Sequence, residues 1–168
     1  MKYDCNVIVC GPAIGKTYLA GIDQRFIDID GMKADYKYGI TNLPLEEKEK
    51  GKLNRGKVIN NDSTTYAINL LKETIKNNKI ALLSYSEKIL NYLVENNIKY
   101  CLVYASIELV EDYANRMKKR GNSDVFIKEM TNIENWQKFY EQNENDKRPT
   151  YKIKLKKGEY LSNIKDMF

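Results

Sequence analysis

The stretch VIVCGPAIGKTYLA, residues 7–20, decides the fold that we predict for this chain. Its first residues, Val7–Val9, form an apolar, β-branched run that is typical of a buried strand. Its last residues, Thr17–Ala20, suit the beginning of a helix, and Gly11 and Gly15 lie between the two. Glycines let backbone N–H groups turn inward around an anion, and the start of a helix adds N–H groups that have no partner within the helix. This order of strand, loop and helix therefore predicts a phosphate-binding loop.

The loop resembles the Walker A motif of the P-loop kinases, which ends in the same Gly-Lys-Thr as residues 15–17. The residues that this resemblance assigns to nucleotide binding are Gly11, Pro12, Ala13, Ile14, Gly15, Lys16 and Thr17. It implies that Lys16 reaches the β- and γ-phosphates of ATP and that the Thr17 hydroxyl ligates Mg²⁺. A strand-to-helix turn that contains Gly-Lys-Thr by chance is the alternative interpretation.

The loop departs from the Walker A consensus at one point. The consensus has four residues between its glycines, whereas Gly11 and Gly15 enclose three. Either the loop has lost a residue, or Cys10 occupies the place of the first glycine. In both cases we expect a buried Cys10 and loop amides that face inward.

The composition is ordinary for a soluble globular protein. The 168 residues suffice for one domain with its own core, and 42% of them are hydrophobic while 30% are charged. No apolar run approaches the ~18 residues of a membrane span, and the first residues lead directly into a strand without a signal peptide. Cys5, Cys10 and Cys101 form no close pair, which indicates reduced thiols and a cytoplasmic location.

The charged residues restrict the chemistry. The chain contains no histidine, so histidine-based acid–base catalysis and histidine metal sites are excluded. Carboxylates, lysines and arginines must therefore supply any catalysis. The net charge of +5 is compatible with a nucleic-acid partner, but small phosphate-bearing substrates explain it equally well.

Strands and helices are predicted to alternate along the chain. We expect strands at about 5–9, 25–30, 79–84, 100–104 and 151–155, and helices at about 15–20, 62–75, 87–96, 107–120, 124–143 and 160–167. Apolar strands separated by helices indicate a parallel sheet covered on both faces. Ligands of such sheets bind at the carboxyl ends of the strands. This rule brings the loop at 10–17 to the same edge as the strand ends near Asp28, Ser84 and Tyr104.

Two carboxylates, Asp28 and Asp30, stand on the same side of the second predicted strand, because side chains alternate along a strand. Carboxylates this close repel each other unless a cation, a hydroxyl or a proton lies between them. The pair resembles the Asp-x-Asp of shikimate-kinase-type P-loop kinases. By this resemblance Asp28 would lie near Mg²⁺ and its waters, and Asp30 would hold or deprotonate the acceptor. Two solvated carboxylates at a strand end are the alternative.

Cations gather at the end of the helix predicted at 107–120. Arg116 and Arg120 are four residues apart and share a helix face with Lys119, so their charges repel unless an anion binds there. The pattern resembles the lid of the nucleoside-monophosphate type of P-loop kinase, in which arginines close on the transferring phosphates. The resemblance assigns residues 106–125 to a lid. A basic, solvated helix end is equally compatible with the sequence.

The irregular region 31–61 corresponds, in the order of elements, to the acceptor-binding part of these kinases. Within it Arg55, flanked by Gly51 and Gly56, is the candidate for binding an acceptor phosphate. Near the end of the chain, the lysines at 152, 154 and 156 alternate with apolar residues, which is typical of an edge strand whose lysines block further pairing.

The resemblance covers the order of elements over most of the chain, but only three short stretches of residues. It implies one three-layer α/β domain, residues 1–168, with five parallel strands in the order 2-3-1-4-5. It also implies a phosphotransferase that moves the γ-phosphate of Mg-ATP to a small acceptor, with a nucleotide or nucleoside as the first choice. The catalytic residues would be Lys16, Asp30, Arg116 and Arg120. A kinase acting on a base or an end of DNA or RNA, and a nucleotide-binding module without transferase activity, remain as alternatives.

Overall fold

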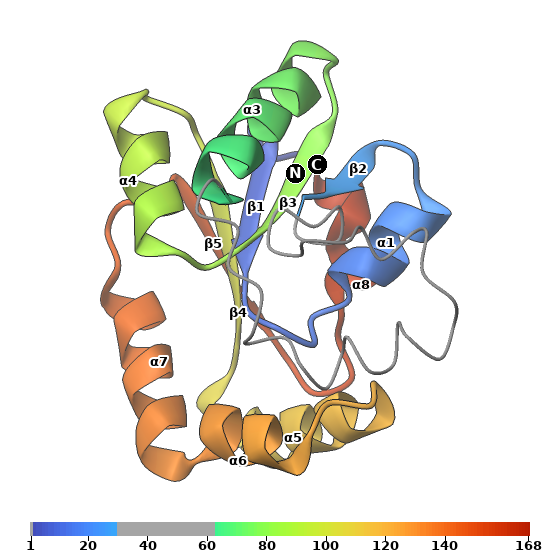
Figure 1. Cartoon of the computed structure of the whole chain (residues 1–168), viewed down its shortest axis with the longest axis vertical. Coiled ribbons are helices and arrows are strands. Elements are labelled where there is room, and N and C mark those ends of the chain that lie inside the picture. The colour runs from blue at the N-terminus through green and yellow to red at the C-terminus, as the bar shows by residue number, and fades with distance from the viewer. Residues whose placement is uncertain (1, 30–62) are drawn as a thin grey trace.

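The computed structural model describes residues 2–29 and 63–168. Within these ranges five strands form one sheet in the order β2-β3-β1-β4-β5, and every pair of neighbours is parallel (Figure 1). The strands are β1 (Val7–Cys10), β2 (Phe26–Asp28), β3 (Ile80–Ser84), β4 (Cys101–Ala105) and β5 (Tyr151–Leu155). The predicted parallel sheet and its order 2-3-1-4-5 are therefore confirmed.

Helices cover both faces of the sheet, as Figure 1 shows. The α-helices are α1 (Lys16–Ile22), α3 (Ser63–Lys76), α4 (Glu87–Glu95), α5 (Val110–Lys119), α6 (Asp124–Thr131), α7 (Ile133–Asn145) and α8 (Leu161–Ile164). Two 3₁₀ turns, η2 (Ile107–Leu109) and η3 (Lys165–Met167), precede α5 and follow α8. One apolar core joins the sheet to α1, α5 and α8, and the other joins it to α3 and α4.

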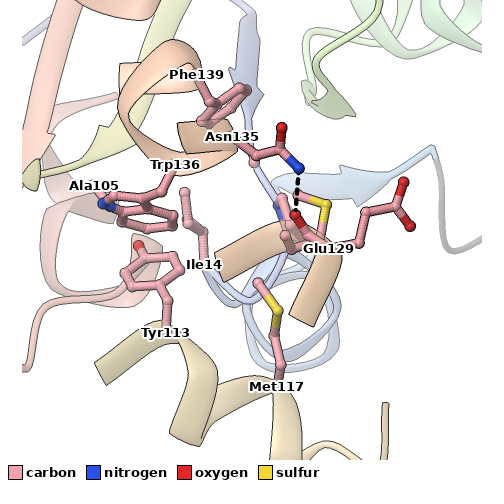
Figure 2. A pocket seen from close by; sticks show the side chains of 11 residues that line it. Ile14, Ala105, Tyr113, Met117, Glu129, Asn135, Trp136 and Phe139 are labelled. Carbon is pink, nitrogen blue, oxygen red and sulfur yellow. Dashed lines mark hydrogen bonds between the residues drawn. The ribbon is translucent and has the colours of Figure 1, made fainter. Parts of the chain in front are cut away.

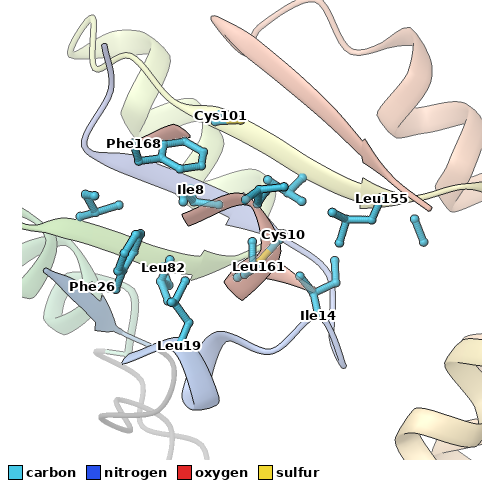
Figure 3. Packing of buried hydrophobic residues seen from close by; sticks show 14 of the residues in the cluster. Ile8, Cys10, Ile14, Leu19, Phe26, Leu82, Cys101, Leu155, Leu161 and Phe168 are labelled. Atoms are coloured by element: carbon cyan, nitrogen blue, oxygen red, sulfur yellow. The ribbon is translucent and has the colours of Figure 1, made fainter. Parts of the chain in front are cut away.

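The central strand β1 contributes to both cores. Ile8 and Cys10 point into the core of α1 and α8 (Figure 3), whereas Val7 and Val9 point into the core of α3 and α4. All four side chains are fully buried. This two-sided burial explains why the strand is a continuous apolar run rather than an alternating one. Each such side chain stabilises the fold by about 1.5–3 kcal/mol relative to exposure. The same burial fixes the point at which the following loop leaves the sheet.

The cysteines are buried and free, as the sequence predicted. Burial raises the pKa of the Cys5 thiol to about 11 and raises that of Cys101 further. A raised pKa keeps both groups as thiols at neutral pH, and the thiolate is the reactive form. Neither side chain is therefore suited to nucleophilic chemistry.

The helix predicted as one element at 124–143 is wrong, because the structure has two helices that meet at Asn132. The Asn132 side chain accepts hydrogen bonds from the N–H groups of Glu134 and Asn135, which is the capping contact that begins α7. The helix predicted at about 15–20 also continues further, to Ile22. The break at Asn132 matters most, since it turns α7 back along the sheet.

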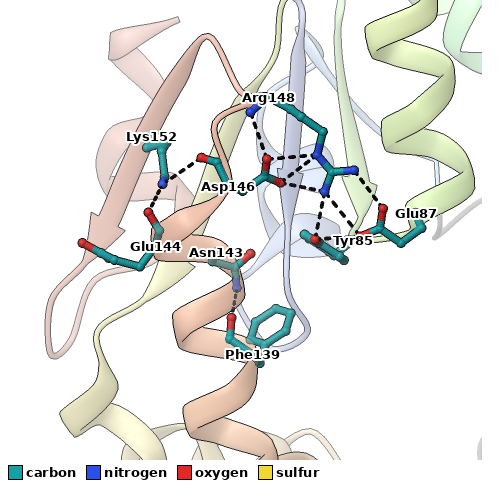
Figure 4. Close-up of polar contacts among 8 residues, drawn as sticks. All are labelled: Tyr85, Glu87, Phe139, Asn143, Glu144, Asp146, Arg148 and Lys152. Atoms are coloured by element: carbon teal, nitrogen blue, oxygen red, sulfur yellow. Dashed lines mark hydrogen bonds and ion pairs between the residues drawn. The ribbon is translucent and has the colours of Figure 1, made fainter.

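Helix α7 is anchored to the sheet by charged contacts near its end. On β5, an edge strand of the described sheet as predicted, Lys154 forms an ion pair with Glu144 at 3.0 Å. The guanidinium of Arg148 binds the carboxylates of Asp146 and Glu87, each at 2.8 Å, and also donates to the Tyr85 hydroxyl at 3.2 Å (Figure 4). These contacts join the end of α7 to the start of α4.

Replacing Arg148 with methionine should destabilise the fold by about 1–3 kcal/mol, because the Asp146 carboxylate, only 5% exposed, would lose its charged partner. Hydrogen bonds from Arg148 lower the pKa of Glu87 and, against the opposing effect of burial, that of Asp146. A lowered pKa stabilises the fold above the ordinary carboxyl range and loses this effect as the pH falls. The free energies of unfolding in urea of wild type and Arg148→Met should therefore differ at pH 7, and the difference should shrink as the pH falls below the ordinary carboxyl range.

The matched control is Lys99→Met, which removes the ion pair with Asp4 between two exposed side chains. An exposed pair contributes little to stability, so this variant should unfold like the wild type. If the loss of unfolding free energy in Arg148→Met stayed the same in acid, the stabilisation could not come from the ion pairs of Arg148 with Asp146 and Glu87.

Candidate functional site

The loop after β1 contains two residues in the left-handed region of backbone space. Ala13 has φ 57° and Gly15 has φ 100°, and α1 begins directly afterwards at Lys16. The ring of Tyr160 lies 3.5 Å from where a Cβ on Gly15 would stand. The distance is an ordinary van der Waals contact, so it is the positive φ that favours glycine at position 15. The N-cap residue Gly15 makes no side-chain capping contact with α1.

Cys10 belongs to β1 rather than to the loop. Its Cα is in register with Ser84 of β3 and Val103 of β4, and its side chain is fully buried in the core. A side chain that points into the core does not enter the space enclosed by the loop. The structure thus confirms the buried Cys10, and it explains how a residue with a side chain can stand where the consensus has its first glycine.

The side chain of Lys16 spans the loop. Its ammonium donates to the Gly11 carbonyl at 3.3 Å and to the Ser84 hydroxyl at 3.1 Å. These contacts hold the charge at the carboxyl ends of β1 and β3, where ligands of parallel sheets bind. The sequence placed Ser84 at this edge but gave it no role.

Thr17 and Asp28 meet at the same edge. The Thr17 hydroxyl donates to a carboxylate oxygen of Asp28 at 2.7 Å, and Asp28 is only 7% exposed. Phe26 of β2 points into the core beside α1, and Ile29, just after the strand, points into the opposite core. A hydroxyl and a carboxylate are ligands that Mg²⁺ accepts, and the ion usually keeps several waters and takes phosphate oxygens as well. The chemistry of these two side chains is therefore compatible with a magnesium ion.

The proposed contact of Thr17 and Asp28 with a magnesium ion does not require a preformed cluster of acidic side chains. Among residues 2–29 and 63–168, no group of three or more histidine, cysteine or acidic side chains could hold a metal. Asp30, Arg55 and the acceptor region 31–61 lie outside the described residues, and their predicted roles stay predictions.

Arg116 and Arg120 have different surroundings, although the sequence places them on one helix face. Arg116 is buried: its guanidinium pairs with Asp112 at 2.7 Å, donates to the Glu159 carbonyl at 2.9 Å and lies 3.9 Å from the centroid of the Tyr160 ring. Arg120 is exposed at the end of α5. Arg116 therefore reaches the loop through Tyr160, which packs on Gly15. The catalytic role of both arginines in a closing lid stays a prediction.

A cavity of about 320 Å³ lies between the loop and helices α5, α6 and α7 (Figure 2). Gly11 and Pro12 line the side nearest the loop, while Met117 and Trp136 form part of its buried, apolar depth. The sequence analysis assigned Trp136 only to a helix. That Trp136 lines a cavity could be foreseen only from the break at Asn132, because this break sets the angle between α6 and α7.

Comparison of the chain with protein-family models finds no matching family, and comparison with curated proteins finds no matching relative. None of the helices in the described ranges is both long enough and apolar enough to cross a bilayer. The site is therefore interpreted from its own geometry.

Proposed function

We propose that this protein is a phosphotransferase that binds Mg-ATP at the loop 10–17 and passes its γ-phosphate to a small acceptor, a nucleotide or nucleoside. The observation that carries the proposal is the meeting of Lys16, Thr17 and Asp28 at the carboxyl edge of a parallel 2-3-1-4-5 sheet. One cation, one hydroxyl and one carboxylate at such an edge are the groups that phosphoryl transfer uses most.

Each of these groups has a distinct task in the proposed reaction. The loop amides would bind phosphate oxygens, and the positive charge of Lys16 would stabilise the negative charge that spreads over the transferring group. Thr17 and Asp28 would hold Mg²⁺, directly or through water. The magnesium ion, when bound, neutralises phosphate charge and orients the nucleotide. Asp30 would accept the proton of the acceptor hydroxyl, as its position two residues after Asp28 predicts.

The role of Thr17 can be tested by removing its hydroxyl at nearly constant shape. Thr17→Val should weaken ATP binding by about 10-fold or more in the presence of Mg²⁺, because loss of an oxygen that ligates or orients the ion has effects of this size. Binding in EDTA should change little, since the loop amides and Lys16 remain. Isothermal titration of ATP with and without Mg²⁺ measures both quantities.

Thr17→Ser is the matched control, because it keeps the hydroxyl and loses only a methyl group. It should retain the magnesium-dependent affinity of the wild type. Equal losses for Thr17→Val with and without Mg²⁺ would refute the metal-binding role and leave Thr17 as a structural partner of Asp28.

A further inference from the structure

The cavity beside the loop is lined largely by aromatic rings and methionine side chains. The Tyr113 and Trp136 rings lie 5.3 Å apart, and Figure 2 shows them on one side of the cavity with Met117 below and Phe139 above. Aromatic faces and thioethers form favourable contacts with another planar ring. The volume of about 320 Å³ lies at the small end of the range for ligand pockets. The shape and chemistry of the walls thus suit one small aromatic group.

The walls are held in place before any ligand binds. The indole nitrogen of Trp136 donates to the Ile107 carbonyl at 2.7 Å, and the side-chain amide of Asn135 donates to the Glu129 carbonyl at 2.9 Å (Figure 2). The first contact fixes the indole against η2, and the second joins α6 to α7 at the rim. A pocket whose side chains are already ordered loses less conformational entropy when a ligand binds.

The polarity of the lining indicates a neutral ligand with hydrogen-bonding atoms. Among the described residues that line the cavity, none is a lysine or an arginine, and the one charged side chain is the exposed Glu129. The hydroxyl of Tyr113, a residue 2% exposed, has no hydrogen-bond partner in the described part of the chain. Buried polar groups gain free energy when they find a partner. A ring nitrogen or carbonyl oxygen beside Tyr113 would supply one, whereas a phosphate in this cavity would find no cation.

The cavity also borders the place where the proposed transfer occurs. Gly11 lines it, and the Gly11 carbonyl accepts a hydrogen bond from the Lys16 ammonium at 3.3 Å. The Phe139 ring lies 3.6 Å from where a Cβ on Gly11 would stand. Gly11 therefore lies between Phe139 and the Lys16 ammonium, and a ligand packed on Phe139 would be close to that charge. At the other end of the loop, Tyr160 already covers Gly15.

We propose that this cavity binds the planar heterocyclic base of a nucleoside-type acceptor, so that the acceptor hydroxyl points toward Lys16. The inference rests on the proposed phosphotransferase function and narrows its acceptor class to compounds with an uncharged aromatic ring. In the transfer, the acceptor oxygen forms the new P–O bond, the bond to the departing ADP breaks, and the hydroxyl proton passes to a carboxylate base.

Trp136 offers a direct readout of binding, because it is the only tryptophan among the 168 residues. Adenosine, guanosine, cytidine and thymidine are titrated separately while the indole fluorescence is followed, and at least one should change it saturably. Met130→Phe, which fills the cavity from α6, should weaken that nucleoside by about 10-fold or more, because overpacking of this size opposes binding by more than 1.4 kcal/mol. ATP affinity, measured separately by calorimetry, should stay the same.

Two further variants keep the test decisive. Val125→Phe introduces the same ring on the same helix at a position 78% exposed and should leave nucleoside binding unchanged. Phe139→Leu removes an aromatic wall at similar volume and should weaken the nucleoside by about 3- to 10-fold. It serves in place of Met130→Phe if circular dichroism shows that the latter is unfolded.

The outcomes separate this inference from the proposed function. If no nucleoside changes Trp136 fluorescence while ATP still binds, the pocket assignment is overturned and the nucleotide site stands. If Met130→Phe weakens ATP instead of the nucleoside, the cavity holds the base of ATP and the acceptor assignment is overturned. If ATP does not bind the wild type at all, the proposed function itself fails.

Discussion

Replacing Lys16 with methionine should lower phosphoryl transfer by about 10²- to 10³-fold, the loss that follows removal of one group that stabilises transition-state charge. The ammonium of Lys16 bridges the Gly11 carbonyl and the Ser84 hydroxyl, and thus lies at the carboxyl ends of β1 and β3. Methionine keeps an unbranched side chain of similar length, so the loss reports on the charge rather than on packing. A coupled assay for ADP release, with a panel of nucleosides and nucleoside monophosphates as acceptors, measures it.

Lys88→Met provides the control for this prediction. Lys88 is an exposed lysine on α4, remote in sequence from the loop, and its replacement should leave the rate unchanged. If Lys16→Met and Lys88→Met were equally active, the interpretation of 10–17 as a phosphate-binding loop would have to be abandoned.

Asp30→Asn should lower turnover by about 10²-fold or more while nucleotide affinity stays nearly constant. An amide is almost isosteric with a carboxylate but cannot accept the proton of the acceptor hydroxyl, and general-base catalysis contributes effects of this size. The nucleotide would remain bound, because the loop and Lys16 are untouched. ATP affinity by calorimetry and transfer rate by the coupled assay, measured on the same preparation, separate the two quantities.

Asp124→Asn, an exposed carboxylate on α6, is the control for a general effect of charge. It should change neither quantity. If Asp30→Asn also left turnover intact, the chain would be better described as a nucleotide-binding module, and the search for an acceptor would lose its basis.

The sequence predicted the sheet well because its signals are local. Strands β1, β3 and β4 are short apolar runs, and β5 alternates lysines with apolar residues, so each could be recognised from its own residues. The order of the strands was implied by the resemblance to the P-loop kinases. The contact between Thr17 and Asp28 also follows from strand order, since both residues stand at the carboxyl edge. Such features need no knowledge of how helices pack.

The cavity could not be predicted in the same way. Its walls come from β4, the loop and helices α5, α6 and α7, and their meeting depends on packing between segments distant in sequence. Asn132 could have indicated the break between the two helices, because asparagine is a preferred capping residue. The helical periodicity on both sides nevertheless favoured one continuous helix. The burial of Arg116 against Tyr160 could not be predicted from the sequence either. Two arginines four residues apart have the same pattern in the sequence, and only a tertiary contact distinguishes the buried one from the exposed one.

The position of β1 in the sheet has a consequence for how the protein is made. Ile8 pairs with Leu82 on one side and with Cys101 on the other, so β1 leaves the ribosome well before the strands that it pairs with. At typical elongation rates the delay is on the order of 5 to 20 seconds. During this time an apolar strand and the loop 10–17 are exposed without their neighbours, and contacts so distant in sequence also form slowly. The nascent chain should therefore bind chaperones until β4 emerges, and only then should it acquire the nucleotide affinity that we propose.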